Sequence, residues 1–220
     1  MNENKNFTVA KLSAEVAYWE ELDGGKILKR LEKIARLCYK SEDKIKPGSD
    51  KKLLKAIIDR GHEAMIEHEK VTVKVVCDRG VSHEWVRHRI ASYAQESTRY
   101  CDYSKGKFGS GITVIEPLGM NIPGEKEEWE QAMEDANRHY QNLRAMGVPA
   151  QRARHVLPIS TKTEMFITFN MREWRAFFKL RAAEPAHPHI RFLSRELFHL
   201  FKENVPVLFD DLSFPENDQD

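Results

Sequence analysis

The chain has 220 residues, of which 41% are hydrophobic and 31% are charged, and its formal net charge is +1 at pH 7. This composition excludes a disordered chain and gives little support for bulk attraction to nucleic acid or to an anionic membrane. No apolar run is long enough to cross a bilayer, and the start, MNENKNFTVAKL, has no basic region followed by a long apolar core. We therefore expect a cytoplasmic protein that binds anions only through local groups of arginines.

The first helical pattern covers residues 26–39, where apolar residues recur along one stripe. Pro47 and the following glycine interrupt the chain. Ser49 or Asp50 can then cap a second helix, which Gly61 ends. The N-terminal part of the chain is therefore predicted to be helical.

Residues 71–77 alternate between apolar and polar side chains, which predicts a half-buried strand. A short helix is predicted for residues 81–91, because Val81 and Trp85, and then Val86 and Ile90, are spaced i,i+4. Residues 97–111 are polar and contain glycine, so we expect a loop there.

A long amphipathic helix is predicted around residues 129–143, followed by a short helix within 149–158. Residues 165–169 alternate as a second strand, and helices follow at 172–181 and 187–202. This order predicts an α+β fold, rich in helices, with a central mixed or antiparallel sheet flanked by helices. We expect one domain over residues 1–220, with flexible ends at 1–6 and 214–220.

The densest polar stretch surrounds Arg87, His88 and Arg89. Arginine offers a planar, permanently charged fork for phosphate oxygens, and histidine adds a flat donor or acceptor that can approach a cofactor ring. An equally good interpretation is a solvated basic helix whose charges pair with Glu84 and Glu96.

A second cation lies on a helical stripe with aromatic residues. Trp174, Phe177 and Arg181 fall on one face of a predicted helix, so the guanidinium should point inward. A buried guanidinium needs an acceptor, because burying it alone costs several kcal/mol. A bound substrate is one candidate, while a salt bridge to Glu184 or Glu196, or snorkelling to solvent, is the alternative.

Several common sites are not predicted. Cys38, Cys77 and Cys101 lie far apart and have no metal or redox spacing, so reduced thiols that pack as small residues are expected. His62 and His68 are six residues apart and do not share a helix face, so no metal site is expected. The sequence has neither a GxGxxG fingerprint nor a GxxxxGK[ST] loop.

Arg87-His88-Arg89 followed by seven residues and Ser97 resembles the RHRx7S motif of the flavin-dependent thymidylate synthases. The surrounding RHRIASYAQESTRY is similar to the same family. Further segments on both sides of it resemble family segments in the family's order: residues 35–39, 61–68, 154–158, 170–172 and 180–181. Together these segments extend over about residues 35–191. The resemblance implies a fold like that of the thymidylate synthase complementing proteins.

The resemblance also implies an activity, namely reductive methylation of dUMP to dTMP without an enzyme nucleophile. 5,10-methylenetetrahydrofolate would supply the carbon, FAD would carry the hydride, and NADPH would be the reductant. It further implies a homotetramer with active sites at subunit interfaces, and no nucleic acid or membrane partner. The alternatives are a flavoprotein of the same fold that only oxidises NAD(P)H, or a nucleotide- or RNA-binding module.

Site residues carry over from the resemblance by position. Those expected to bind FAD are His62, Arg87, His88, Arg89, Gln95, Asn170 and Arg172. Those expected to bind dUMP are Glu84, Arg87, Gln95, Ser97, Thr98, Arg99, Arg154 and Arg181. Arg181 is the expected catalytic residue, because it matches the arginine that contacts the uracil and favours its ionisation. Five positions depart from the family pattern: Ala64, Glu84, Gln95, Ala176 and His189.

Overall fold

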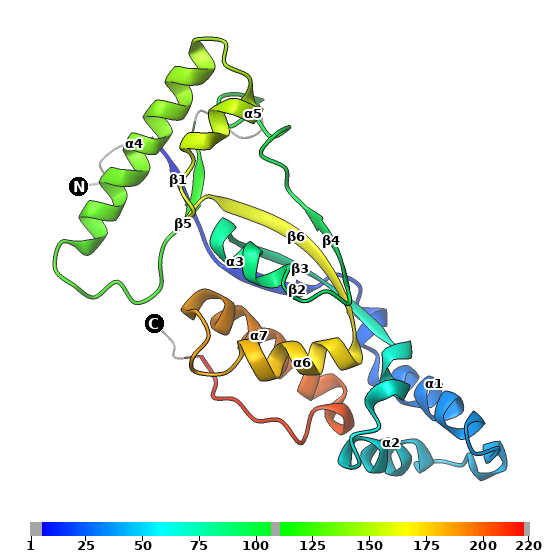
Figure 1. Cartoon of the computed structure of the whole chain (residues 1–220). Coiled ribbons are helices and arrows are strands. Elements are labelled where there is room, and N and C mark those ends of the chain that lie inside the picture. Colours follow the sequence, from blue (N-terminus) through cyan, green and yellow to red (C-terminus); the bar gives the residue numbers. More distant parts are fainter. Residues whose placement is uncertain (1–5, 107–110, 218–220) are drawn as a thin grey trace. The chain divides into compact units, whose positions relative to one another are not determined.

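The computed structural model describes residues 6–106 and 111–217, and these residues form two compact units (Figure 1). As far as they are described, the first unit comprises Met1–Ser13, Val76–Trp85 and Ala94–Met165, and the second unit comprises Ala14–Val75, Val86–Tyr93 and Phe166–Asp220. The predicted single domain stays a prediction.

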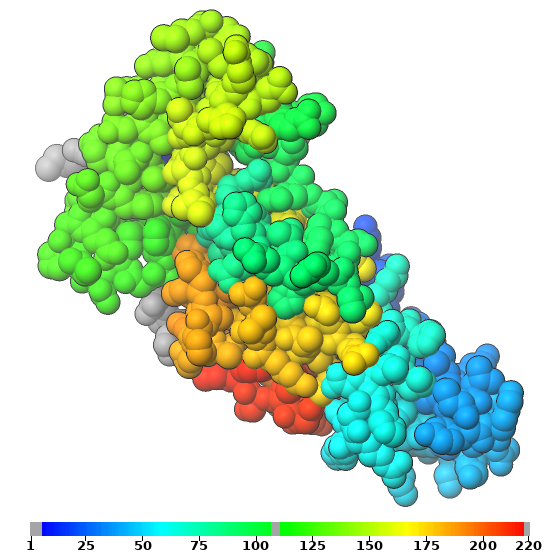
Figure 2. Space-filling view, in the orientation of Figure 1, coloured from blue at the N-terminus to red at the C-terminus, as the bar shows by residue number. Residues whose placement is uncertain are grey.

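Helices α1 (Gly24–Leu37) and α2 (Ser49–Asp59) pack against each other in the second unit, and the 3-10 helix η3 (Glu63–His68) contacts α1. Figure 2 shows the surface of α1, in blue, directly against that of the cyan residues that follow it. Asp23 caps α1 by accepting a hydrogen bond from the Lys26 amide at 3.1 Å. Both helices were predicted.

The predicted cap of α2 was wrong. The N-cap is Gly48, whose φ of 80° favours glycine. The Ser49 hydroxyl instead lies 2.7 Å from both the Glu32 carboxylate and the Lys46 carbonyl, and it can donate its single proton to either. Its contact with Glu32 connects α2 to α1.

Helices α6 (Met171–Arg181) and α7 (Pro188–Asn204) enclose the aromatic core of the second unit. Trp174 and Phe178 stack at 5.6 Å between ring centroids, and Phe198 and Phe201 of α7 meet Phe178 edge-on. These four side chains are buried. The core therefore forms on the face that the helical spacing predicted.

Four strands form one sheet in the order β2 (Ser13–Val16), β3 (Lys70–Asp78), β6 (Lys162–Asn170) and β4 (Ala91–Gln95). The sequence predicted β3 and β6, and it missed β2 and β4. The helix-rich α+β class is confirmed.

In the first unit, β1 (Thr8–Ala10) pairs in parallel with β5 (Thr113–Ile115). The long helix α4 (Glu125–Ala145) buries Met133 and Tyr140 in a cluster that includes Phe7 and Val114 of β5, and the predicted long helix is confirmed. The short helix α5 (Ala150–Ala153) follows and continues as the 3-10 helix η5 (Arg154–Val156). The remaining 3-10 helices are η1 (Trp19–Leu22), η2 (Glu42–Lys44) and η6 (Pro206–Leu208).

The helix predicted for residues 81–91 ends much earlier than expected. Helix α3 covers Arg79–Trp85, and residues 91–95 are the strand β4. Val86 and Ile90, whose i,i+4 spacing predicted the second half of this helix, are 43% and 65% exposed. Because they have no core to pack against, nothing holds a helix there, and Arg87-His88-Arg89 lie in the connection between α3 and β4.

The chain ends were expected to be flexible, and residues 1–5 and 218–220 lie outside the described residues. Within the described tail, the Phe214 ring meets Phe198 at 4.9 Å. The Asn217 amide donates to the Phe192 carbonyl at 3.0 Å. No described helix is both long enough and apolar enough to cross a membrane.

Candidate active site

His88 lies between a carboxylate and a guanidinium in the second unit. Its Nδ1 is 2.9 Å from Glu173 Oε1, and its Nε2 accepts a hydrogen bond from Arg181 Nε at 3.3 Å. The sequence predicted His88 and Arg181 as site residues, but it did not predict their direct contact.

The His88 side chain is buried against aromatic rings. Its centroid lies 5.0 Å from that of Phe177 and 5.8 Å from that of Phe169. Burial lowers the pKa of His88 below its ordinary value; the nearby Glu173 opposes this shift and Arg181 adds to it. The neutral imidazole is therefore the favoured form.

Asn170 and Arg172 lie at the start of α6. The Asn170 side chain caps the helix by accepting from the Glu173 amide at 2.8 Å. Arg172 pairs with Glu67 at 2.5 Å and lies 4.0 Å from Glu63. A flavin on Arg172 would therefore have to share this guanidinium with Glu67.

His62 lines a pocket of about 340 Å³ between α1, α2 and η3. Its other lining residues include Cys38 and Ala64, which belong to two of the segments that carry the family resemblance. The walls are largely apolar, as a site for a flat ring system requires. Of the predicted FAD residues, His62 is the one that lines this pocket.

Arg87 and Arg89 are exposed, and within the described ranges neither makes an ion pair. Glu96, one of the acids that could have neutralised them, instead pairs with Lys162 at 3.2 Å. Guanidinium groups without carboxylate partners keep their donors for an anionic ligand.

The predicted dUMP residues gather mainly in the first unit. Arg154, at the start of η5, donates to the Thr98 hydroxyl at 3.3 Å. Thr98 lies in a turn in which the Ser97 hydroxyl accepts from the Arg99 amide, and the Arg99 guanidinium lies 5.5 Å from the centroid of the Tyr100 ring. Arg154 and Arg99 also make no ion pair among the described residues.

Gln95 lies on β4 and donates to the Thr163 hydroxyl at 3.2 Å. The same hydroxyl accepts from Arg79 at 2.9 Å, and Arg79 also donates to the Glu96 carbonyl. Glu84 is half-buried on α3. Gln95 is the last residue of the edge strand β4, two residues before Ser97, and these hydrogen bonds hold its side-chain amide in place.

Two residues that sequence reasoning missed have clear roles in these contacts. Glu173 is the partner of His88, and Arg79 organises Gln95 and the Glu96 backbone. No short motif marks either residue, because each acts through a contact between segments that are distant in sequence.

The thiols differ in environment. Cys77 is buried, and burial raises the pKa of its thiol far above the ordinary value. Cys101 is half-buried, while Cys38 is exposed and lies 3.8 Å from the sulfur of Met65. No group of three or more potential metal ligands is found among the described residues.

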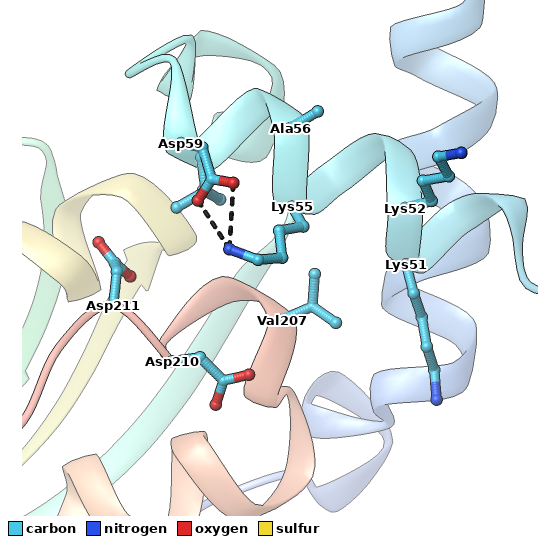
Figure 3. A pocket seen from close by; sticks show the side chains of 9 residues that line it. Lys51, Lys52, Lys55, Ala56, Asp59, Val207, Asp210 and Asp211 are labelled. Carbon is cyan, nitrogen blue, oxygen red and sulfur yellow. Dashed lines mark hydrogen bonds and ion pairs between the residues drawn. The ribbon is translucent and has the colours of Figure 1, made fainter.

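Another cavity, of about 400 Å³, lies between α2 and the segment that includes Val207, Asp210 and Asp211 (Figure 3). The Lys55 ammonium pairs with Asp59 at 2.9 Å, and Asp211 pairs with Arg175 at 2.7 Å. Its charges already neutralise one another in part, and none of the predicted site residues lines it. We do not place the active site there.

The described geometry can be compared with known proteins. The model of the family described as "Thymidylate synthase complementing protein" matches residues 25–207. The chain belongs to this family. The flavin-dependent thymidylate synthase of Geobacter sulfurreducens is 36% identical over 185 residues, which cover 80% of this chain and 78% of that protein. The enzyme of the same name from Mycobacterium avium is 32% identical over 216 residues, covering 90% and 83%.

A solved structure shows the same fold. The UMP/dUMP methylase PolB of Streptomyces cacaoi, bound with 5-Br dUMP, superposes with a TM-score of 0.74 at 22% identity, covering 91% of this chain and 94% of that chain. The fold of a thymidylate synthase complementing protein is therefore confirmed. The family match extends over both units and over all of the predicted site residues.

The residues predicted to bind FAD and those predicted to bind dUMP lie mostly in different units of the chain. Gln95 lies in the first unit, while the other predicted FAD residues lie in the second. Arg87 and Arg181 lie in the second unit, while the other predicted dUMP residues lie in the first. Each unit thus carries most of one predicted set.

Proposed function

We propose that this chain is a flavin-dependent thymidylate synthase that methylates dUMP to dTMP. One observation in this family member carries the proposal. Among the described residues, no ion pair is made by four arginines of the predicted site: Arg87, Arg89, Arg99 and Arg154. A nucleotide phosphate and the pyrophosphate of FAD need such guanidinium groups. These arginines belong to the RHRx7S motif and to the segments that follow it.

FAD fits the residues of the second unit. The apolar pocket at His62 suits a ring system, and Arg87 and Arg89 suit the pyrophosphate. FAD, when bound, would supply the hydride chemistry, with NADPH as reductant and 5,10-methylenetetrahydrofolate as carbon donor. The proposed cofactor set is completed by His88, Gln95, Asn170 and Arg172, although Glu67 already pairs with Arg172.

dUMP would bind through the first unit. Arg99 and Arg154 would take its phosphate, while Gln95, Ser97, Thr98 and Glu84 would orient the nucleotide. Arg181 would contact the uracil and stabilise negative charge on the base as it reacts. No thiol is required, and the buried Cys77, with its raised pKa, is unsuited to act as a nucleophile.

A two-stage experiment tests the proposal. The absorption spectrum of the purified chain should contain flavin bands, and incubation under anaerobic conditions with dUMP, 5,10-methylenetetrahydrofolate and NADPH should yield dTMP. A flavin spectrum with NADPH oxidation but no dTMP would favour the oxidase alternative. Absence of flavin binding would favour the nucleotide- or RNA-binding module.

A matched variant tests the chemistry. The triple variant Cys38→Ala, Cys77→Ala, Cys101→Ala should still form dTMP, because no enzyme thiol adds to the uracil. Loss of turnover in a triple variant that still folds and binds FAD would contradict this mechanism.

We further infer a cytoplasmic homotetramer with active sites at subunit interfaces, which binds neither nucleic acid nor membrane. Light scattering should then report four times the 25.6 kDa chain mass.

A further inference from the structure

Glu173, Phe177 and Arg181 are spaced i, i+4 and i+8, so they follow one face of α6. The His88 ring lies over this face. The imidazole packs against the Phe177 ring in the middle of this face. One of its ring nitrogens contacts Glu173 and the other contacts Arg181. One imidazole therefore connects the first turn of the helix with its last turn.

The chemistry of the three groups fixes the proton on His88. Arginine has donors and no acceptor, so His88 Nε2 must accept from Arg181 Nε. Nδ1 must then carry the proton of the neutral ring and donate it to Glu173 Oε1. If Nε2 carried a proton, an N–H group would face the guanidinium and this hydrogen bond would be lost.

The residues around His88 restrict rotation of its imidazole ring. His88 is 8% exposed, and Phe169 and Phe177 pack against it. Its backbone carbonyl accepts from the Tyr93 hydroxyl at 2.6 Å. Glu173 lies in the first turn of α6, where the helix N-terminus stabilises a carboxylate.

We propose that Glu173 is a positioning residue: it holds the proton of His88 on Nδ1, so that Nε2 accepts from Arg181 and fixes the direction of that guanidinium. The consequence for turnover rests on the proposed function, in which Arg181 contacts the uracil. The hydrogen-bonded chain itself does not depend on that function. Glu173 touches neither substrate nor cofactor in this proposal.

The first experiment reads the tautomer directly in the full-length protein. Long-range ¹H–¹⁵N correlation spectra of histidine-labelled protein should show His88 protonated on Nδ1, assigned by comparison with His88→Asn. Glu173→Ala leaves the buried Nδ1–H group without this acceptor, so the proton should move to Nε2 at the expense of the hydrogen bond from Arg181. In Glu173→Gln the proton should remain on Nδ1, because the amide oxygen can still accept it. A His88 that stays protonated on Nδ1 in Glu173→Ala would overturn the proposal.

The second experiment measures turnover of the same variants with saturating FAD. Misplacement of the guanidinium should lower the kcat of Glu173→Ala by about tenfold to a hundredfold. The KM for dUMP should change little, and Glu173→Gln should recover most of the turnover. Glu203→Ala, on the exposed end of α7, is the matched control and should behave as the unaltered protein.

The outcomes separate this proposal from the proposed function. Unchanged kcat in Glu173→Ala would overturn the positioning role even if dTMP is formed. A Glu173→Gln as impaired as Glu173→Ala, with the tautomer retained, would overturn it as well. If the unaltered protein forms no dTMP, the proposed function fails. The tautomer and the solvent protection of the Arg181 Nε proton then still decide whether Glu173 positions Arg181.

Discussion

Two groups of arginines, three from the second unit and two from the first, differ in whether a carboxylate or imidazole acceptor already holds the guanidinium. In the second unit, Arg175, Arg172 and Arg181 all have partners on neighbouring elements: Arg175 meets Asp211 at 2.7 Å, Arg172 meets Glu67, and Arg181 meets His88. Among the described residues of the first unit, Arg154 donates to the Thr98 hydroxyl and Arg99 lies by the Tyr100 ring, and neither arginine makes an ion pair.

Whether an arginine already has a partner determines the expected effect of its substitution. An arginine that already has a partner has a fixed direction before any ligand arrives, and its substitution damages the fold or the geometry of the site. An arginine without an acidic partner keeps its donors for an anion, and its substitution should act on ligand affinity. Arg87 and Arg89 of the second unit belong to this latter group, so the distinction follows the partners and not the unit alone.

The largest expected effect is on stability, at Arg175. This side chain is 1% exposed, and it contacts Glu63 at 3.0 Å, Asp211 and the Leu208 carbonyl. Arg175→Met would remove the partner of Asp211, the nearest cation of Glu63 and a donor to the Leu208 carbonyl, which should cost about 3 kcal/mol in the free energy of unfolding. Urea unfolding measures this loss. Lys55→Met, in an exposed pair with Asp59, is the control and should change stability little. An equally small change at Arg175 would break the comparison.

The next effect is on turnover, at Arg181. Arg181→Ala should lower kcat by about a hundredfold to a thousandfold, the range typical of removing one donor to a developing negative charge. FAD should stay bound, which the flavin spectrum checks. Lys179→Ala, two residues earlier on the exposed side of α6, should keep its turnover. Retained turnover in Arg181→Ala would remove its catalytic role, and loss of FAD would move it to the cofactor set.

These contacts also show how far the sequence could lead. The helical spacing in α1, α4, α6 and α7 and the alternation in β3 and β6 were sufficient, because each of these elements buries a continuous apolar face. The short strands β1, β2, β4 and β5 were missed, since strands of three to five residues depend on partners elsewhere in the chain.

The site was predicted as a set of residues but not as a set of contacts. The RHRx7S resemblance pointed to His88, and the aromatic stripe pointed to Arg181 as an inward cation. Their hydrogen bond and the role of Glu173 could not be predicted, because they arise where the connection after α3 meets α6. The helix predicted through Arg87–Arg89 was wrong for a related reason: the exposed Val86 and Ile90 satisfy its spacing without any core to bury them.

A smaller effect, on affinity, is expected at the cations without acidic partners. Arg154→Ala should raise the KM for dUMP by about tenfold to a hundredfold, the value of one or two hydrogen bonds to a charged group. Arg89→Ala is the matched change in the second unit and should instead weaken FAD binding by about tenfold. Steady-state kinetics with saturating FAD and a flavin titration separate the two. If both variants affect the same ligand, the division of the predicted sets between the units fails.

The smallest effect concerns a cation of the first unit that does have a partner. Arg144 donates to both oxygens of Asp102, at 3.1 Å and 2.7 Å. The hydrogen bond from Arg144, followed by those from Ser104, holds the pKa of Asp102 below its ordinary value of 3.8. Asp102→Asn should lower the free energy of unfolding at pH 7 by about 1 kcal/mol, since both side chains keep some contact with solvent.

The pH dependence of this last effect follows from the direction of the pKa shift. A carboxylate with a lowered pKa stabilises the folded state fully above its unfolded pKa, and this contribution disappears as the pH falls towards the folded pKa. The difference between Asp102→Asn and the unaltered protein should therefore be constant near neutrality and should shrink below about pH 4. Asp135→Asn removes an exposed pair with Arg138 on α4 and should leave the pH profile almost unchanged. A stability difference that persists undiminished in acid would show that Asp102→Asn acts through packing. The ion pair between Arg144 and Asp102 would then not be the source of the stabilisation.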